Sequence, residues 1–283
     1  METTKESYLK ELVRRKYSPN TIKVYEGCFK VFCDYFSNKN LPILTEHDIK
    51  DFLLFLVENL GISSSSENQY INSVKFYYEG VLNYPRKTYF LNRPRPEKKL
   101  PEILSTEEVA KLLNAFTNLK HYTIASILYG SGLRISELIN LKIADIDSQR
   151  MIINVRQGKG KKDRQTLLSH PLLELLRKYY KQYHPKDYLF NGQQKAPKYS
   201  SRSIQQIIRN AACKARINKD VHPHTLRHCF ATHLLESGVD IRYIQQLLGH
   251  AHLKTTEIYT HVTTSHLNKI VSPFDKLRKN IAA

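Results

Sequence analysis

A histidine and an arginine that could bind one phosphate stand three positions apart, directly after Pro223. His224 and Arg227 share one face if this segment is helical, and proline is a favourable first residue of a helix. A guanidinium can bind two phosphate oxygens as a fork, and a helix N-terminus attracts anions. Taken alone, however, such a pair is more typical of a surface arginine and a capped histidine.

Four further residues of suitable chemistry lie elsewhere in the chain, namely Arg134, Lys159, His250 and Tyr259. The lysine lies between two glycines, where a flexible amine can donate a proton to a leaving oxygen, although most such lysines are only solvated. A phenol becomes a nucleophile when nearby cations offset its pKa of about 10, although most tyrosines are core or surface residues. Together these groups suit a phosphodiester that is bound, attacked by an oxygen and split without a metal.

A zinc site is the main alternative for the histidines. His224 and His228 are four apart, but the helix of zinc proteases requires a glutamate directly after its first histidine, and this chain has Thr225 there. No carboxylate or thiol is spaced to complete a ligand set. We therefore predict that the chain holds no metal.

The charge balance predicts a polyanionic partner. The 283 residues include 44 Lys and Arg against 26 Asp and Glu, a net charge of +18. Basic residues that contact phosphates release condensed counterions, which favours nucleic acid over a merely basic soluble protein. The excess is uneven, because residues 1–84 hold ten basic and eleven acidic side chains. Any anion-binding face on this first part must therefore come from local clusters.

Cysteine usage and hydropathy indicate the compartment. The four cysteines have neither the spacing of a metal or redox motif nor the density of a disulfide framework, which favours a reducing cytosol. The polar N-terminus is unlike a signal peptide, and no apolar run approaches the roughly 20 residues of a membrane span. We expect a cytoplasmic, nucleoid-associated protein of a prokaryote with no membrane contact.

The periodicity of residues 1–84 is that of helices. Apolar side chains recur every three or four residues from Asn20 to Phe36, and similar patterns begin at Thr45 and after the serines at 63–66. Residues 85–101 hold four prolines among six basic residues, which predicts an extended linker. We therefore predict a helical first domain at 1–84, a linker at 85–101 and a second domain at 102–283.

The second domain is predicted to be helical with a small β-sheet. Ser105 and Glu108 form a capping-box pattern that starts an apolar helix ending near Gly130, and a short helix follows Gly132. Two β-rich segments, 151–155 and 164–168, flank the glycines around Lys159 and predict a hairpin. Further helices are expected at 171–183, 201–215, 223–236 and 241–248. The predicted class is mainly α with a small antiparallel sheet.

Several motifs, taken in order, resemble those of the tyrosine recombinases of the phage integrase family, in particular its Xer-like and integron-type members. They are Gly130 to Leu138, Gly158 to Arg164, His222 to Leu235, Leu247 to His250 and Thr255 to His261. Ser18 to Thr21 and the serine-rich start of the third helix resemble the core-binding domain of the same family. The stretch between Tyr188 and Val221 is short for the extra helix typical of integron integrases, which favours a Xer-like or mobile-element integrase.

The resemblance implies a site-specific DNA recombinase that cleaves and rejoins strands through a 3′-phosphotyrosyl bond, without metal, ATP or any other cofactor. The implied residues are the nucleophile Tyr259, the general acid Lys159, the phosphate-clamping Arg134 and Arg227, the proton-transferring His224, the pocket-supporting His250, and Glu137, which would support the cations. Without the resemblance, Arg134 and Glu137 are typical of a surface ion pair.

The resemblance also implies how double-stranded DNA is held. Two domains would form a C-shaped clamp, and the apolar tail after Tyr259 would dock on a neighbouring copy, giving a homotetramer on two sites. From the basic clusters we expect DNA contacts at Arg14, Arg15, Lys23, Lys75, Arg93, Arg95, Lys161, Lys162 and Arg164. The alternatives are a DNA-binding module without chemistry, which needs no phenol, and a type IB topoisomerase, whose active-site chemistry is similar.

Overall fold

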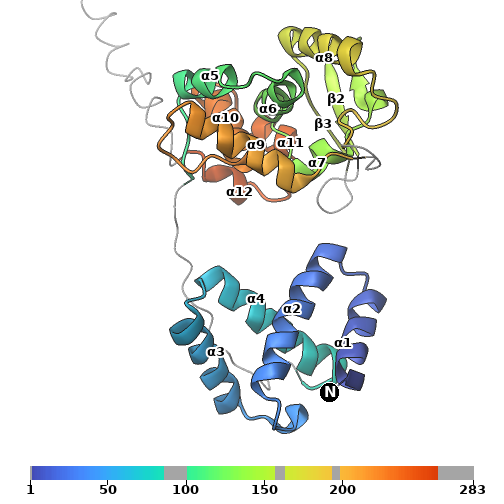
Figure 1. The fold of residues 1–283 in the computed structure, drawn as a ribbon, viewed down its shortest axis with the longest axis vertical. Helices are drawn as coiled ribbons and strands as arrows, with labels where there is room; N and C mark the ends of the chain where they lie inside the picture. Colours follow the sequence, from blue (N-terminus) through green and yellow to red (C-terminus); the bar gives the residue numbers. More distant parts are fainter. Residues whose placement is uncertain (1, 86–100, 157–162, 193–197, 261–283) are drawn as a thin grey trace, which may run out of the picture. The chain divides into compact units, whose positions relative to one another are not determined.

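The chain folds as two compact units, Met1–Lys99 and Leu100–Ala283. The structure is a computed structural model that describes residues 2–85, 101–156, 163–192 and 198–260 (Figure 1). The predicted linker and the predicted C-terminal tail lie almost wholly outside these residues.

Helices α1 to α4 form the first unit: Glu2–Arg14, Pro19–Tyr35, Glu46–Leu60 and Ser64–Lys75. Ser18 and Ser63 cap α2 and α4, and Thr45 forms a capping box with Asp48 at the start of α3. These caps explain why the periodic segments begin where the sequence predicted. A π-helical turn, Phe76–Val81, continues α4.

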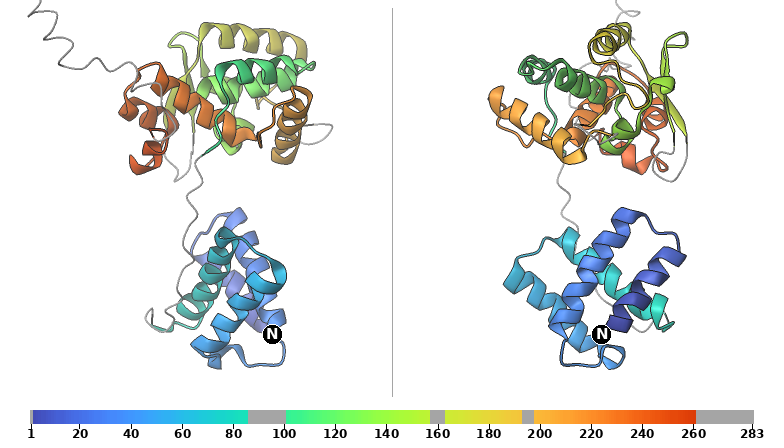
Figure 2. Two further views of the ribbon diagram at one scale, coloured as in Figure 1. Left: turned by 90° about the vertical axis from the view of Figure 1, so that its left-hand side faces the viewer. Right: turned by 45° about the vertical axis from the view of Figure 1, so that its right-hand side comes forward.

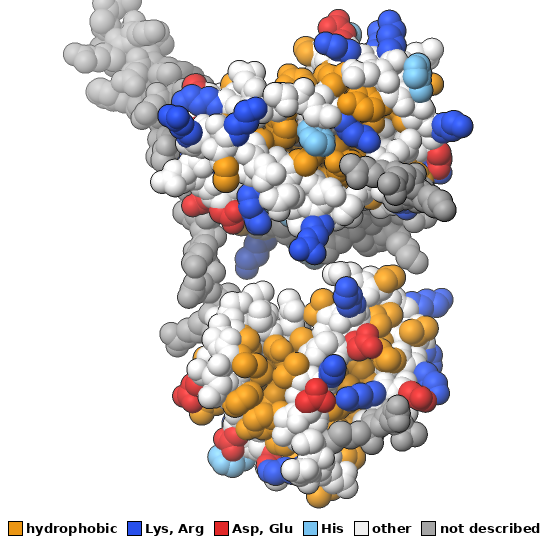
Figure 3. Space-filling view, in the orientation of Figure 1, with side chains coloured by type: hydrophobic (Ala, Val, Ile, Leu, Met, Phe, Trp, Pro, Cys, Tyr) orange, Lys and Arg blue, Asp and Glu red, His pale blue; other side chains and the backbone are white. Residues whose placement is uncertain are grey.

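The core of the first unit is rich in aromatic rings. Tyr8 of α1 stacks on Phe29 of α2 with ring centroids 4.0 Å apart, and its hydroxyl lies 2.8 Å from the Ser73 hydroxyl. The first domain was predicted to be helical, but no separate helix was predicted at the position of α1. Its sequence is mostly polar, and its fully buried hydrophobic residues, Tyr8 and Leu12, are too few to show a clear periodic pattern. Hydrophobic side chains also reach the surface of this unit (Figure 3), including Leu54, Val57 and Leu60 of α3.

The second unit is a helical body with a small sheet at one edge (Figures 1 and 2). The helices α5 to α12 are Thr106–Asn114, Leu119–Ser131, Ile135–Asn140, His170–Tyr183, Ser201–Lys214, Pro223–Glu236, Ile241–Leu248 and Lys254–Glu257. Helix α6 is central, packed against α8 and α10. The predicted single helix before Gly130 is wrong, because Asn118 caps a new helix by accepting from the backbone N–H groups of Lys120 and His121.

The sheet has three antiparallel strands in the order β1-β2-β3: Ile146–Asp147, Ile152–Val155 and Arg164–Leu167. The register pairs Ile152 with Leu167 and Val155 with Arg164, so the predicted hairpin is confirmed. Its turn, with Lys159, lies outside the described residues. The predicted class, mainly α with a small antiparallel sheet, is confirmed as well. Strand β3 packs against α6 and α11, which places Arg164 at the helical body.

Candidate active site

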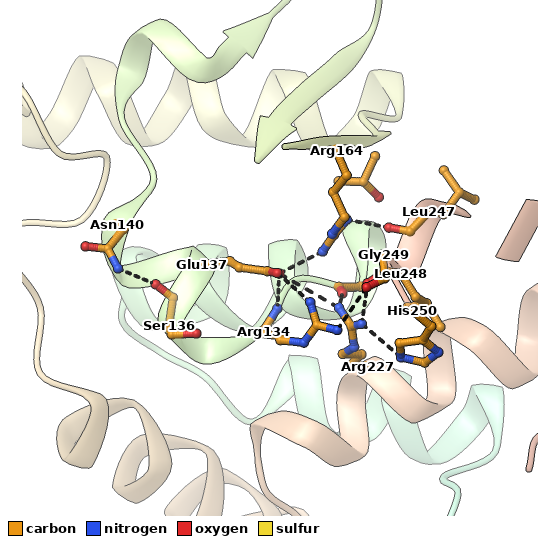
Figure 4. A network of polar contacts seen from close by, with 12 residues as sticks. Arg134, Ser136, Glu137, Asn140, Arg164, Arg227, Leu247, Leu248, Gly249 and His250 are labelled. Atoms are coloured by element: carbon orange, nitrogen blue, oxygen red, sulfur yellow. Dashed lines mark hydrogen bonds and ion pairs between the residues drawn. The ribbon is translucent and has the colours of Figure 1, made fainter. Parts of the chain in front are cut away.

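The ends of several helices meet at the place where the predicted phosphate-binding residues lie (Figure 4). Helix α6 ends at Gly132, whose φ of +59° is a left-handed conformation that suits glycine. Arg134 follows at the N-terminal end of α7, and Gly249 ends α11 in the same left-handed conformation, with φ of +63°. Both sharp turns bring backbone carbonyls and side chains from distant segments to one place.

Glu137 is the central anion of this site. Its side chain is 4% exposed. One carboxylate oxygen accepts from Arg134 Nη1 at 2.7 Å, and the other accepts from Arg164 Nη2 and from the Arg134 backbone N–H, both at 2.7 Å. Burial alone would raise the pKa of Glu137, but Arg164 and Arg134 outweigh it and lower the pKa below its ordinary value. Glu137 is therefore ionised and holds the arginines in place.

Arg227 lies on α10 and is 3% exposed. Its Nη1 donates to the Gly132 carbonyl at 2.5 Å and lies 3.8 Å from Glu137, and its Nη2 donates to the Leu248 carbonyl at 2.6 Å. Burial, together with the charges of Arg134 and Arg164, lowers the pKa of Arg227 to about 9. The guanidinium thus stays charged at neutral pH, in a surrounding that favours an additional anion.

His250 connects Arg227 to the segment that carries Tyr259. Its Nε2 lies 3.2 Å from Arg227 Nη2, and its Nδ1 lies 3.0 Å from the Thr256 hydroxyl. Because a guanidinium only donates, Nε2 must accept, and Nδ1 carries the proton. Burial and the nearby arginines lower the pKa of His250 to about 4, so the ring is neutral at pH 7.

The Tyr259 hydroxyl lies 3.0 Å from Nδ1 of His228, the residue after Arg227 on α10. Tyr259 is 1% exposed, and its ring packs in a cluster with Phe230, Ile244 and other apolar residues. Burial raises the pKa of Tyr259, and Arg227 and Arg134 partly offset that rise. The phenol is therefore protonated at neutral pH, close to the cations that could stabilise its anion.

His224 occupies the first turn of α10 and is exposed. Its ring centroid lies 6.3 Å from that of His222 and 6.5 Å from that of His228. His224 and Arg227 thus lie on one helix, as the sequence predicted. The arginine is buried, and the histidine is at the surface. Within the described ranges, His, Cys, Asp and Glu side chains form no group of three that could hold a metal ion.

The predicted DNA contacts have different surroundings. Lys23 is exposed and Lys75 half-buried, while Arg14 and Arg15 both bind the Glu11 carboxylate at 2.6 Å. Arg164 was predicted as an exposed DNA contact, but its side chain is 8% exposed and bonded to Glu137, because β3 packs on α11. The remaining predicted contacts and the catalytic candidate Lys159 lie outside the described residues. Those contacts are Arg93, Arg95, Lys161 and Lys162.

Three features of the site were not predicted from the sequence. They are the bond from His228 to Tyr259, the bond from His250 to Thr256, and the carbonyls that end α11. The adjacency of His228 to Arg227 was a signal for the first. Nothing in the sequence indicated the carbonyls, because every residue carries one.

Sequence comparison decides the family. Residues 102–266 match the phage integrase family, and residues 6–88 match the N-terminal SAM-like domain of phage integrases. The chain belongs to the phage integrase family. It is a tyrosine recombinase of the Xer-like type, an enzyme that recombines DNA at specific sites.

Relatives and solved structures agree with this membership. The chain is 40% identical to the tyrosine recombinase XerA of Pyrococcus horikoshii over 259 residues, which is 90% of this chain and 87% of XerA. A crystal structure of XerA recombinase matches with a TM-score of 0.56 and 36% identity, covering 94% of this chain and 96% of that one. A structure of XerH bound to its palindromic difH substrate matches with a TM-score of 0.70 and 25% identity, covering 88% and 78%. DNA is accordingly the partner of this recombinase. No described helix is long and apolar enough to cross a membrane.

Proposed function

We propose that this recombinase cleaves DNA by attack of the Tyr259 hydroxyl on the scissile phosphate. The observation that carries the proposal is the position of that hydroxyl, bonded to the residue next to Arg227, in a site with three arginines. Of the groups brought together here, the phenol is the one suited to forming a phosphodiester with DNA.

The proposed step exchanges one phosphodiester for another. The phenol passes its proton to His224, the bond from Oη to phosphorus forms, and the bond from phosphorus to the 5′ oxygen breaks. Lys159 gives a proton to the leaving 5′ oxygen, which becomes a hydroxyl. A 5′ hydroxyl of the partner duplex then attacks the 3′-phosphotyrosyl bond in the reverse sense. The covalent bond conserves the diester energy, so the reaction consumes no ATP.

Arg134 and Arg227 are proposed to stabilise the charge on the non-bridging oxygens as it grows in the transition state. His250, held between Arg227 and Thr256, is proposed to donate to the same phosphate after rotation or tautomer exchange, and His224 to meet it from the surface of α10. Glu137 is proposed to hold Arg134 and Arg227 in position. These assignments extend the roles implied by the family to the geometry of this chain.

Burial of Tyr259 adds a condition to this mechanism. Tyr259 is 1% exposed, and its hydroxyl is bonded to His228. We therefore propose that the segment after α12 shifts when the DNA site docks, breaking the bond to His228 and presenting the phenol to the phosphate. The tail beyond residue 260, proposed to dock on a neighbouring copy in a homotetramer, would be coupled to this shift.

A suicide substrate tests the nucleophile. A duplex carrying the recombination site and a nick beside the scissile phosphate loses its short 5′-hydroxyl fragment after cleavage, which traps the covalent adduct. We expect the adduct with the native chain, unchanged by chelators, and none with Tyr259→Phe. An adduct that persists in Tyr259→Phe, or that a chelator abolishes, would disprove the proposed step.

A second substrate tests the acid. Sulfur leaves from phosphorus without needing a proton, so a 5′-bridging phosphorothiolate should restore cleavage to Lys159→Ala. The same substrate should not restore cleavage to Tyr259→Phe, which serves as the control. Failure to rescue Lys159→Ala would assign the acid to another residue.

We also propose that the two units jointly hold one duplex as the C-shaped clamp expected from the family. The solved structure of XerH bound to its difH substrate supports DNA binding by a relative. In this chain the first unit would bind through the local basic clusters of its helices, and the segment 85–101 would connect it to the catalytic unit. The proposed setting is the prokaryotic cytoplasm, on chromosomal or mobile-element DNA.

A further inference from the structure

Arg164 is a third buried arginine of the active site, and it comes from the sheet. Its Nη2 donates to Glu137 at 2.7 Å, and its Nη1 donates to the Leu247 carbonyl at the end of α11. The side chain is 8% exposed. Both of its terminal nitrogens are thus bonded within the protein, and it touches the same carboxylate as Arg134 (Figure 4).

The end of α11 is bonded to all three arginines in succession. The carbonyl of Leu247 accepts from Arg164, that of Leu248 from Arg227 at 2.6 Å, and that of Gly249 from Arg134 at 3.4 Å. The last carbonyls of a helix have no partners within it and carry its negative partial charge. Three guanidinium groups that would repel one another are therefore gathered on one helix end, directly before His250.

Close packing shows that this path of Arg164 is built into the fold. A Cβ atom on Gly249 would lie 2.4 Å from Cδ and 3.0 Å from Nε of Arg164. The absence of a side chain at Gly249 thus lets Arg164 cross the turn and reach Glu137. The turn before His250 and the path of Arg164 depend on each other.

Glu137 has only one carboxylate to share among the three cations. Its Oε2, bonded to Arg164 at 2.7 Å, also lies 3.8 Å from Arg227. If Arg164 were removed, this oxygen would keep only its bond from the Arg134 backbone N–H, and it could draw Arg227 inward by a direct ion pair. An arginine bound in that way is less available to a phosphate oxygen.

We propose that Arg164 is a positioning residue for catalysis: it occupies Glu137 Oε2 and fixes the end of α11, so that Arg227 and His250 face the scissile phosphate. It acts without touching DNA, through the residues that do. The inference rests on the proposed roles of Arg227 and His250.

Arg164→Met tests this, because methionine keeps an unbranched apolar chain and removes both donors. We expect single-turnover cleavage of the suicide substrate to slow about 10- to 100-fold, the equivalent of one or two charge-assisted hydrogen bonds. The Kd for the DNA site should change less than about twofold, because no groove contact is lost. Arg164→Lys keeps the charge and can reach only one partner. Its cleavage rate should therefore lie between those of the native chain and Arg164→Met.

A methylphosphonate at the scissile position separates positioning from general damage. This substrate lacks one charged non-bridging oxygen, so its transition state depends less on the arginine clamp. Arg164→Met should therefore slow it much less than it slows the natural diester. The matched control is Arg156→Met, which removes another 2.7 Å pair, with Asp145, from a side chain that is 65% exposed. Its cleavage rates on both substrates should stay at the native values.

Three results would overturn the proposal. A parallel loss of DNA affinity and cleavage would make Arg164 a DNA contact, equal slowing on both substrates would reduce its role to stability, and native rates would remove it from the site. Tyr259→Phe is measured beside these variants. An adduct in that variant would refute the nucleophile assignment, whereas the Arg164 outcomes are read from rates of the Tyr259-containing chain.

Discussion

Gly132→Ala should destabilise the catalytic unit by a predictable amount. Gly132 has φ of +59° at the end of α6, and its carbonyl accepts from Arg227. A Cβ atom there would lie 2.4 Å and 2.7 Å from Cδ1 and Cε1 of Phe230. Phe230 is 5% exposed and belongs to the cluster that holds Tyr259, so its ring has little space to retreat.

Two effects add up at this position. The left-handed conformation costs an alanine about 1–2 kcal/mol, and overpacking of a buried ring costs about 1–3 kcal/mol. Gly132→Ala should therefore lower the free energy of unfolding by about 2–5 kcal/mol. Gly238→Ala is the matched control in the same unit, because its φ is +89° and a Cβ there meets nothing within 4 Å. It should cost the conformational part alone.

The measurement is urea unfolding of the full chain by circular dichroism, with hydrogen exchange of α10 peptides reporting on the catalytic unit. Gly132→Ala should also slow adduct formation, because the shifted Phe230 cluster carries the nucleophile and the shifted carbonyl holds Arg227. Equal destabilisation by Gly132→Ala and Gly238→Ala would refute the packing argument. Gly61→Ala, with φ of +59° and no neighbour within 4 Å, checks the conformational cost at the same angle.

Three further predictions concern the charges of the site. Glu137→Gln should lower the free energy of unfolding by about 3 kcal/mol, because buried guanidinium groups lose their counter-charge; urea unfolding measures this, and a change under about 0.5 kcal/mol would contradict it. Arg227→Lys keeps the charge but loses the fork, so single-turnover cleavage should fall about 100-fold or more, and a near-native rate would remove Arg227 from the clamp. The pKa values of His228 and His250 lie at about 4 in the fold and near 6.5 when unfolded; the unfolded chain binds more protons between these values, so the Tm should fall as pH drops from 6.5 to 4. The Tm of His228→Asn should fall less steeply over the same pH range, and an unchanged slope would contradict the low pKa of His228.

Helix positions were predictable wherever a local signal set them. Pro223 starts α10 at its predicted residue, and the glycine after Leu248 ends α11 at its predicted one. Such signals involve neighbours within one turn, which the sequence displays directly. The break between α5 and α6 carried a local signal too, the Asn118 cap, but a continuous apolar pattern concealed it.

Contacts between distant segments were not predictable in the same way. Arg164 follows a run of basic residues, which suggested a DNA-binding arm, yet the packing of β3 on α11 turns its side chain to Glu137. Likewise, His228 and Tyr259 lie 31 positions apart, and only the packing of α10 with the segment after α12 brings them to 3.0 Å. The pairing of His224 with Arg227 was visible because it needs only helical spacing.

The charge of the site follows from these distant contacts. Arg134, Arg164 and Arg227 share a single carboxylate, and the partial charge at the end of α11 offsets only part of the remaining excess. The repulsion among the three cations is thus offset during folding by Glu137 and the backbone carbonyls, before a phosphate binds. A transition state that carries more negative charge than the diester then meets cations that need little rearrangement, which is the condition under which electrostatic catalysis is strongest. The carboxylate and the carbonyls are for this reason as necessary to the chemistry as the arginines, although none of them needs to touch DNA.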